Sequence, residues 1–188
     1  MQFAFTLKYQ LATPWRRGDD AVLAPALATA GVQLVRRRRD RLRLDFRREG
    51  PDVRLAMRCA IAEMGRVIPD AMLAEAAPDY VGLGALARLF GLSRQAMRQV
   101  MVSRAGRFPH PVHEVHAAVW HLATILEWMD AMRLYRFDLP LLETARAAQA
   151  INLALDARRM REVRRHTARL IELPREIAAL LRHAGLPA

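Results

Sequence analysis

The spacing of hydrophobic side chains changes along the first half of the chain, and this change limits which folds are open to it. Apolar and polar residues alternate over residues 3–11 and again over 42–46, as in strands with one buried face. Over residues 53–64 the apolar side chains recur at helical spacing instead. The segment therefore predicts an α+β fold in which helices pack on one face of a sheet.

The remaining elements of this segment follow from local signals. Asp19-Asp20 opens a helix that Gly31 terminates, and Pro51-Asp52 opens the second helix. We expect two further strands, over residues 32–35 and 71–76, with a turn from Arg37 to Asp40. The resulting order, β-α-β-β-α-β, is that of the ferredoxin-like plan.

Composition narrows the class of partner. The chain has 188 residues, 53% of them hydrophobic, and a formal net charge of +11. Such a basic chain favours a polyanionic partner, nucleic acid before membrane. The single cysteine, Cys59, excludes a disulfide framework, and no apolar run approaches the ~18 residues of a membrane span. The N-terminus lacks the pattern of a signal peptide, so we expect a cytoplasmic, nucleoid-associated protein.

Basic side chains gather on the polar face of the predicted sheet. Lys8, Arg41, Arg43 and Arg47 share this face, whereas the aromatic residues fall on the apolar face. Recognition of single-stranded RNA usually requires exposed aromatic rings that stack on bases. Two interpretations remain open: a solvated, arginine-rich face, or a face that contacts a nucleic-acid backbone.

Two proline-containing steps suggest the boundaries between segments. Pro78-Asp79 and the stretch 136–140 disfavour helix before each proline. We expect an α+β domain over 1–78, a second domain over 79–137 and a helical segment over 138–188.

The second segment begins with two short helices. Apolar residues from Leu83 to Phe90 form a helical stripe that Gly91 interrupts, and Ser93 is a good N-cap for the next helix. Met97, Val100 and Met101 supply the buried face of that second helix. Two short helices joined by a tight, glycine-containing turn predict a helix-turn-helix unit.

The exposed side of the second helix carries residues suited to reading DNA. Arg94, Gln95 and Arg98 lie near its N-terminus, and Arg and Gln side chains pair with guanine and adenine in the major groove. Ser93 and the first backbone amides of the helix are suited to holding a phosphate.

A longer motif resembles a known family. Leu86-Ala87-x-x-x-Gly91-x-Ser93-Arg94-Gln95, followed by Phe108-Pro109-x-Pro111 and Trp120, resembles the excisionase and MerR-type winged helix-turn-helix proteins of bacteria and prophages. The resemblance implies that the helix Ser93 to Ser103 reads the major groove. It also implies that a wing from about His113 to Val119 touches the DNA backbone or minor groove. The candidate DNA-binding residues are Ser93, Arg94, Gln95, Arg98, Gln99, Arg104, His113 and His116.

The wing departs from the family pattern because it carries no lysine or arginine between His113 and Val119. A helix-turn-helix unit that contacts a protein is therefore the alternative to one that binds DNA. Four histidines lie within residues 110–121, but no cysteine is near them and Glu114 is the only close carboxylate. We predict no metal ion and no cofactor.

The third segment is predicted to be helical from Leu139 to about Leu170, with a short last helix from Pro174 to His183. One side of the long helix is rich in arginine, and the opposite side is apolar. This apolar stripe favours a homodimer, and packing on the chain's own body is the alternative. The apolar stripe consists of Met160, Val163, Thr167 and Ile171.

No enzyme signature is present: the chain has no phosphate-binding loop, no dinucleotide fingerprint and no HExxH. The leading hypothesis is a sequence-specific protein that binds double-stranded DNA and regulates transcription, a prophage or a mobile element. The alternative is an antitoxin-like interaction protein, which holds a protein partner and uses the helix-turn-helix unit for autoregulation.

Overall fold

The computed structural model describes residues 1–14, 19–104, 106–114 and 116–167. The chain is α+β, as predicted, and it divides into a first unit, Met1–Asn152, and a second unit, Leu153–Ala188. Within the described ranges, no helix is both long enough and apolar enough to cross a membrane.

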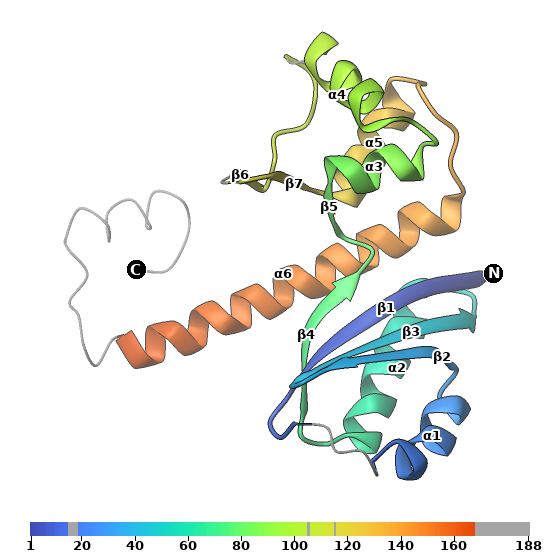
Figure 1. Cartoon of the computed structure of the whole chain (residues 1–188), viewed down its shortest axis with the longest axis vertical. Coiled ribbons are helices and arrows are strands. Elements are labelled where there is room, and N and C mark those ends of the chain that lie inside the picture. Colours follow the sequence, from blue (N-terminus) through green and yellow to red (C-terminus); the bar gives the residue numbers. More distant parts are fainter. Residues whose placement is uncertain (15–18, 105, 115, 168–188) are drawn as a thin grey trace. The chain divides into compact units, whose positions relative to one another are not determined.

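The first part of the chain builds an antiparallel sheet of four strands, in the order β2-β3-β1-β4. Figure 1 shows α1 and α2 on one face of this sheet. The strands are β1 (Gln2–Leu11), β2 (Val32–Arg38), β3 (Arg41–Glu49) and β4 (Ala71–Ala77), and the helices are α1 (Asp19–Thr29) and α2 (Val53–Val67). The elements therefore follow the order expected from the hydrophobic spacing.

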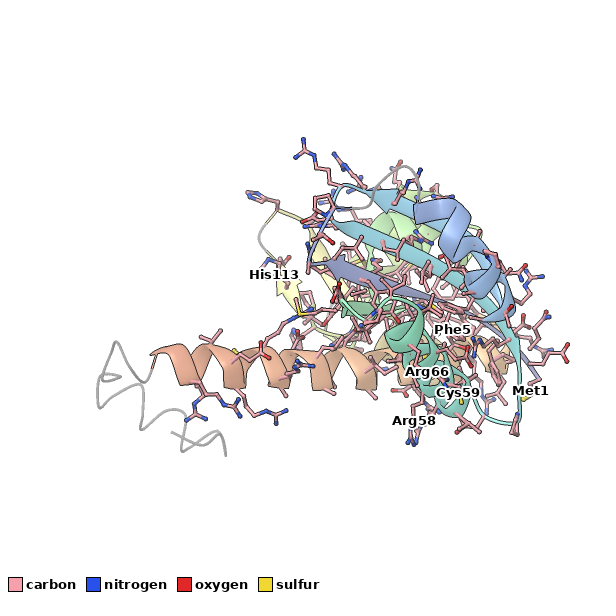
Figure 2. All side chains as sticks on the ribbon, turned by 90° about the horizontal axis from the view of Figure 1, so that it is seen from below. Met1, Phe5, Arg58, Cys59, Arg66 and His113 are labelled. Carbon is pink, nitrogen blue, oxygen red and sulfur yellow. The ribbon has the colours of Figure 1, made fainter. Side chains whose placement is uncertain are left out.

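The alternating apolar residues of β1 and β3 form the core between sheet and helices. Phe5 lies opposite Phe46 in the strand register, and their rings stack with centroids 5.1 Å apart. Met57 and Met64 of α2 are buried in the same cluster. The polar side of α2 faces solvent, where Arg58, Cys59 and Arg66 are labelled in Figure 2.

Strand β2 is longer than its sequence indicates. Arg37 and Arg38, predicted to be part of a turn, continue the strand, and residues 36–38 pair with residues 41–43 of β3. The turn is confined to Arg39 and Asp40, and Arg39 adopts a positive φ of 53°. The run of arginines hides the alternating pattern, and backbone pairing with β3 determines the conformation instead.

The next part of the chain forms a smaller cluster of short elements. A three-stranded sheet in the order β5-β7-β6 accompanies three helices. These elements are β5 (Tyr80–Gly82), α3 (Leu83–Leu89), α4 (Arg94–Ser103), β6 (His113–Glu114), β7 (Ala118–His121) and α5 (Leu122–Ala131). Leu86, Met97, Ile125 and Met129 are fully buried at its centre.

Helix α6 (Leu139–Thr167) contributes to both hydrophobic clusters. Leu142 and Ala145 belong to the cluster around Met97, and Ala147 and Ala148 belong to the cluster around Phe5. The domain boundary expected between residues 137 and 138 stays a prediction. The predicted helix after Pro174, and the end of the apolar stripe at Ile171, lie outside the described residues.

Candidate nucleic-acid interface

A tight turn joins α3 to α4. Gly91 has a φ of 65°, a conformation that disfavours side chains with a Cβ atom, and the Leu92 amide donates to the Ala87 carbonyl at 2.8 Å. The two helices are therefore joined by a closed, hydrogen-bonded turn, at the glycine that the sequence indicates.

Ser93 and Met97 fix helix α4 at its start and on its inner side. The Ser93 hydroxyl oxygen accepts a hydrogen bond from the Ala96 amide at 3.0 Å, which confirms the predicted N-cap. Met97 is fully buried, and Val100 and Met101 are half-buried against the same cluster. The orientation of α4 is thus set by its cap and by its apolar stripe.

The opposite side of α4 is exposed and polar. Arg94, Gln95, Arg98 and Gln99 all face solvent. Their spacing places two long cations and two amides on one side of the first two turns. These side chains can donate several hydrogen bonds, and the amides can also accept them.

The hairpin of β6 and β7 rests on an aromatic anchor. The Trp120 indole N–H donates to the Pro109 carbonyl at 3.0 Å, and Phe108 packs edge-on against Trp120 and Trp128. The Val112 amide donates to the Val119 carbonyl at 2.7 Å, which closes the base of the hairpin. The Phe-Pro-x-Pro and Trp motifs are explained by these contacts, since they hold the hairpin in place.

An open groove of about 1120 Å³ lies between the exposed side of α4 and the hairpin. Arg94 and Arg98 supply positive charge to it, and His116 lines it from the side of the hairpin. No aspartate or glutamate is among its described lining residues. An anion that enters this groove meets cations and amides and no carboxylate.

The predicted interface residues fall into two groups. Arg94, Gln95, Arg98, Gln99 and His116 all line the groove. The other three do not line it. Ser93 caps α4, Arg104 is half-buried at the far end of that helix, and His113 is exposed on β6. The histidines are not gathered around one point, and within the described ranges no three His, Cys, Asp or Glu side chains are placed to hold a metal ion.

A buried polar network beside this interface was missed by the sequence interpretation. The carboxylate of Asp79 is buried, with one oxygen 2.7 Å from His121 Nδ1 and the other accepting from the Asn152 amide at 2.7 Å. Asn152 also exchanges two hydrogen bonds of 2.8 Å with the backbone N–H and C=O of Ala76.

This network ties β4, β7 and α6 together at the start of β5. Each of its hydrogen bonds joins residues that lie 42 to 76 positions apart in the chain, so no local pattern points to it. The one available signal is the isolated Asn152 among apolar residues of a helix, and a buried asparagine requires partners.

No protein-family model, curated protein or solved structure matches this chain.

Proposed function

We propose that the chain is a sequence-specific protein that binds double-stranded DNA and regulates transcription, a prophage or a mobile element. In this proposal residues 79–137 act as a winged helix-turn-helix domain, with α4 in the major groove, and residues 1–78 adopt a ferredoxin-like arrangement. The protein is a binding protein, not an enzyme, and works in the cytoplasm at the nucleoid.

One observation carries the proposal. A capped helix, held by a buried methionine, presents Arg94, Gln95, Arg98 and Gln99 together in an open groove without carboxylates. A helix that reads bases requires long donors and acceptors on the exposed side of its first turns, and it requires a rigid inner side. The arrangement of α4 supplies both.

The hairpin contributes to the same groove in a different way. His116 is exposed at the hairpin and lines the groove, whereas Glu114 lies outside it. A hairpin with so little positive charge is suited to contact a phosphate through backbone amides or a histidine, not through arginine. We therefore assign most of the affinity at this groove to α4.

Binding of variants to a selected operator and to scrambled duplex tests the proposal. Arg94→Ala and Gln95→Ala should each weaken operator binding by about 1–3 kcal/mol and leave scrambled duplex nearly unaffected. Arg136→Ala is the matched control, since Arg136 is exposed in the same segment and does not line the groove. Fluorescence anisotropy measures all three.

Two outcomes contradict the proposal. Absence of duplex binding by the wild-type chain at low salt removes DNA as the partner. An unchanged ratio of operator to scrambled affinity in both groove variants shows that α4 does not read sequence.

A protein partner is the second candidate, and α6 favours it. In the second unit of the chain, Leu153 and Met160 are 54% and 60% exposed, which leaves apolar surface on the helix open to a partner. A second copy of the chain fits a two-fold DNA site, so we propose a homodimer through this part of α6. An antitoxin-like role would place a different protein on the same surface, and co-purification with the product of a neighbouring gene distinguishes the two.

A further inference from the structure

The open face of the four-stranded sheet carries a second concentration of positive charge. A hollow of about 360 Å³ lies over β1, β2 and β3, and Glu75 is the only acidic residue among its described lining residues. Its basic lining residues are Lys8, Arg36, Arg37, Arg38, Arg41 and Arg43. The lengthening of β2 through Arg38 is what brings the arginine run into this hollow.

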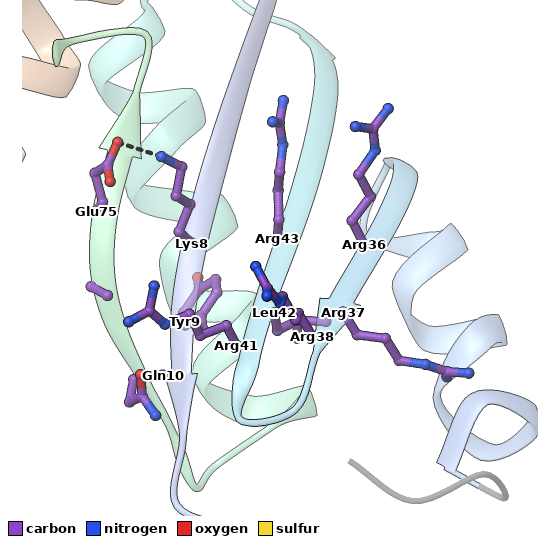
Figure 3. Close-up of a pocket in the computed structure, with 11 residues that line it drawn as sticks. Lys8, Tyr9, Gln10, Arg36, Arg37, Arg38, Arg41, Leu42, Arg43 and Glu75 are labelled. Carbon is purple, nitrogen blue, oxygen red and sulfur yellow. Dashed lines mark hydrogen bonds and ion pairs between the residues drawn. The ribbon is translucent and has the colours of Figure 1, made fainter. Parts of the chain in front are cut away.

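The strand register sets these cations in two rows across the sheet. Arg43 lies opposite Lys8 on one side and opposite Arg36 on the other. In the next row, Arg38 lies directly opposite Arg41. Figure 3 shows Lys8, Arg43 and Arg36 side by side on three adjacent strands.

Few carboxylates balance the two rows. Lys8 pairs with Glu75 at 2.6 Å, and Arg43 pairs with Asp45 at 2.9 Å. Arg36, Arg38 and Arg41 are exposed, and none of them forms an ion pair with a residue that the structure describes.

Like charges in directly opposite positions destabilise a pair of strands. A face selected only for solubility and stability would intersperse both signs of charge. The aligned arginines of β2 and β3 therefore lower the stability of the free protein through charge repulsion, and an anionic partner would remove that repulsion.

We infer that this face binds the phosphate backbone of duplex DNA, as a second contact that rests on the proposed function of the groove at α4. Successive side chains on one face of a strand are about 7 Å apart, and neighbouring strands are about 4.8 Å apart. The two rows thus form a grid of cations that spans several phosphates. The contact is independent of base sequence because it reaches only the backbone.

The nature of the face favours duplex over single-stranded nucleic acid. Proteins that hold single strands stack bases on aromatic side chains. Among the described residues, Ala4, Thr6 and Gln10 share the face with Lys8, while the aromatic rings of Phe5 and Phe46 are buried on the other side. A duplex, whose bases are already stacked, needs only the cations.

The test compares two triple variants with equal loss of charge. Arg36→Gln/Arg38→Gln/Arg41→Gln removes the three cations of the two rows that form no ion pair with a described residue. The control, Arg54→Gln/Arg58→Gln/Arg66→Gln, removes three exposed cations of α2, which packs against the opposite face of the sheet. Anisotropy with operator and with scrambled duplex, over a salt series, gives the slope of log affinity against log salt.

The sheet variant should lower this slope by about two to three, roughly one for each lost phosphate contact. It should weaken operator and scrambled duplex by the same factor, because the contact carries no sequence information. The α2 control should change the slope by less than about one. Arg36→Lys/Arg38→Lys/Arg41→Lys should keep the wild-type slope, since charge alone is required.

The variants separate this inference from the proposed function. An unchanged slope in the sheet variant, together with tight operator binding, overturns the inference and leaves the α4 proposal standing. An unchanged operator-to-scrambled ratio in Arg94→Ala and Gln95→Ala, with the slope of the sheet variant still reduced, overturns the α4 proposal and leaves this inference standing. A sheet variant that loses affinity for an RNA hairpin but not for duplex DNA overturns the assignment to DNA. If the triple variant fails to fold, Arg38→Gln alone should lower the slope by about one, and an unchanged slope overturns the inference.

Discussion

The hydroxyl group of Tyr9 is a polar group that lies in the apolar core of the sheet. Its side chain is buried in the core of the sheet, and its hydroxyl has no hydrogen-bond partner among the described residues. Burial raises the pKa of this phenol well above its ordinary value, because the charged form is poorly solvated there. Its position on the apolar face of β1 follows from the alternating sequence, but the missing partner does not.

This raised pKa predicts a loss of stability in alkali. The unfolded chain releases the Tyr9 proton above about pH 10, while the folded chain retains it. The free energy of unfolding should therefore fall as pH rises above 10, by up to about 1.4 kcal/mol per pH unit. Tyr9→Phe should remove this part of the decline, and Tyr135→Phe should not. Urea unfolding at pH 8 and at pH 10.5 checks both, and equal declines in wild type and Tyr9→Phe would contradict the prediction.

Asn152 is the residue on which the buried network depends. Asn152→Ala removes three hydrogen bonds, and it leaves the Asp79 carboxylate and the Ala76 backbone without those partners. We expect a loss of about 2–4 kcal/mol in the free energy of unfolding, because buried polar groups without partners are costly. Gln149→Ala, at a half-buried position on the same helix, should change it by less than about 0.5 kcal/mol. Denaturant titration of both variants is the measurement, and a loss in Asn152→Ala no larger than in the control would contradict this role.

Residues that act locally could be predicted from the sequence, and residues that act at a distance could not. Ser93 caps the helix that it precedes, and Met97 is buried because of its helical spacing. The sequence indicates Asp79 only as part of a segment boundary beside Pro78, yet its hydrogen-bond partners come from β7 and α6. Which polar residues meet in a core is decided by tertiary packing, which one sequence does not encode in any short pattern.

At the scale of elements, the same substitution has opposite consequences in two helical regions. Gly91 lies in the turn before α4 at a φ of 65°, and an added Cβ atom would meet nothing within 4 Å. Gly91→Ala should therefore lower the free energy of unfolding by about 1 kcal/mol, and this loss comes only from holding alanine in a left-handed backbone conformation. Gly65 lies inside α2, also with open space around it, so Gly65→Ala should stabilise by about 0.5–1 kcal/mol.

Thermal unfolding of the two glycine variants checks this prediction. The melting temperature should fall for Gly91→Ala and rise for Gly65→Ala relative to the wild-type chain. A rise in both would show that the turn does not require a left-handed residue. A turn that also orients α4 should make Gly91→Ala bind the operator more weakly than the wild-type chain does.

The elements themselves were predictable where the hydrophobic period is clear. Strand β1, helix α2 and strand β3 all follow from their alternating or helical spacing. Strand β2 was the exception, since four consecutive arginines carry no period and its second half is held by pairing with β3. The groove at α4 combines both situations: its helix could be predicted from helical spacing, whereas the groove that Arg94 and His116 both line is formed only when the hairpin is folded.

At the scale of the whole molecule, the proposed homodimer rests on the second unit of the chain. Leu153 and Met160 are seven residues apart, so they lie on the same side of α6. Leu153→Glu/Met160→Glu should convert a dimer into a single chain of 21.3 kDa in light scattering. Ala154→Glu, on a different side of the helix, should leave the dimer intact. A wild-type protein that has the mass of one chain at micromolar concentration would contradict the dimer.

Helix α6 also limits which segments of this protein can be exchanged with those of another chain. Because its first half fills two separate hydrophobic clusters, residues 79–137 are not a cassette that can be moved alone from one chain to another. A chimaera that exchanges this segment must still fit Leu142 and Ala145 of the recipient. For the proposed DNA binding, new specificity is therefore most accessible through single changes on the exposed side of α4, where Arg94 and Gln95 belong to neither cluster.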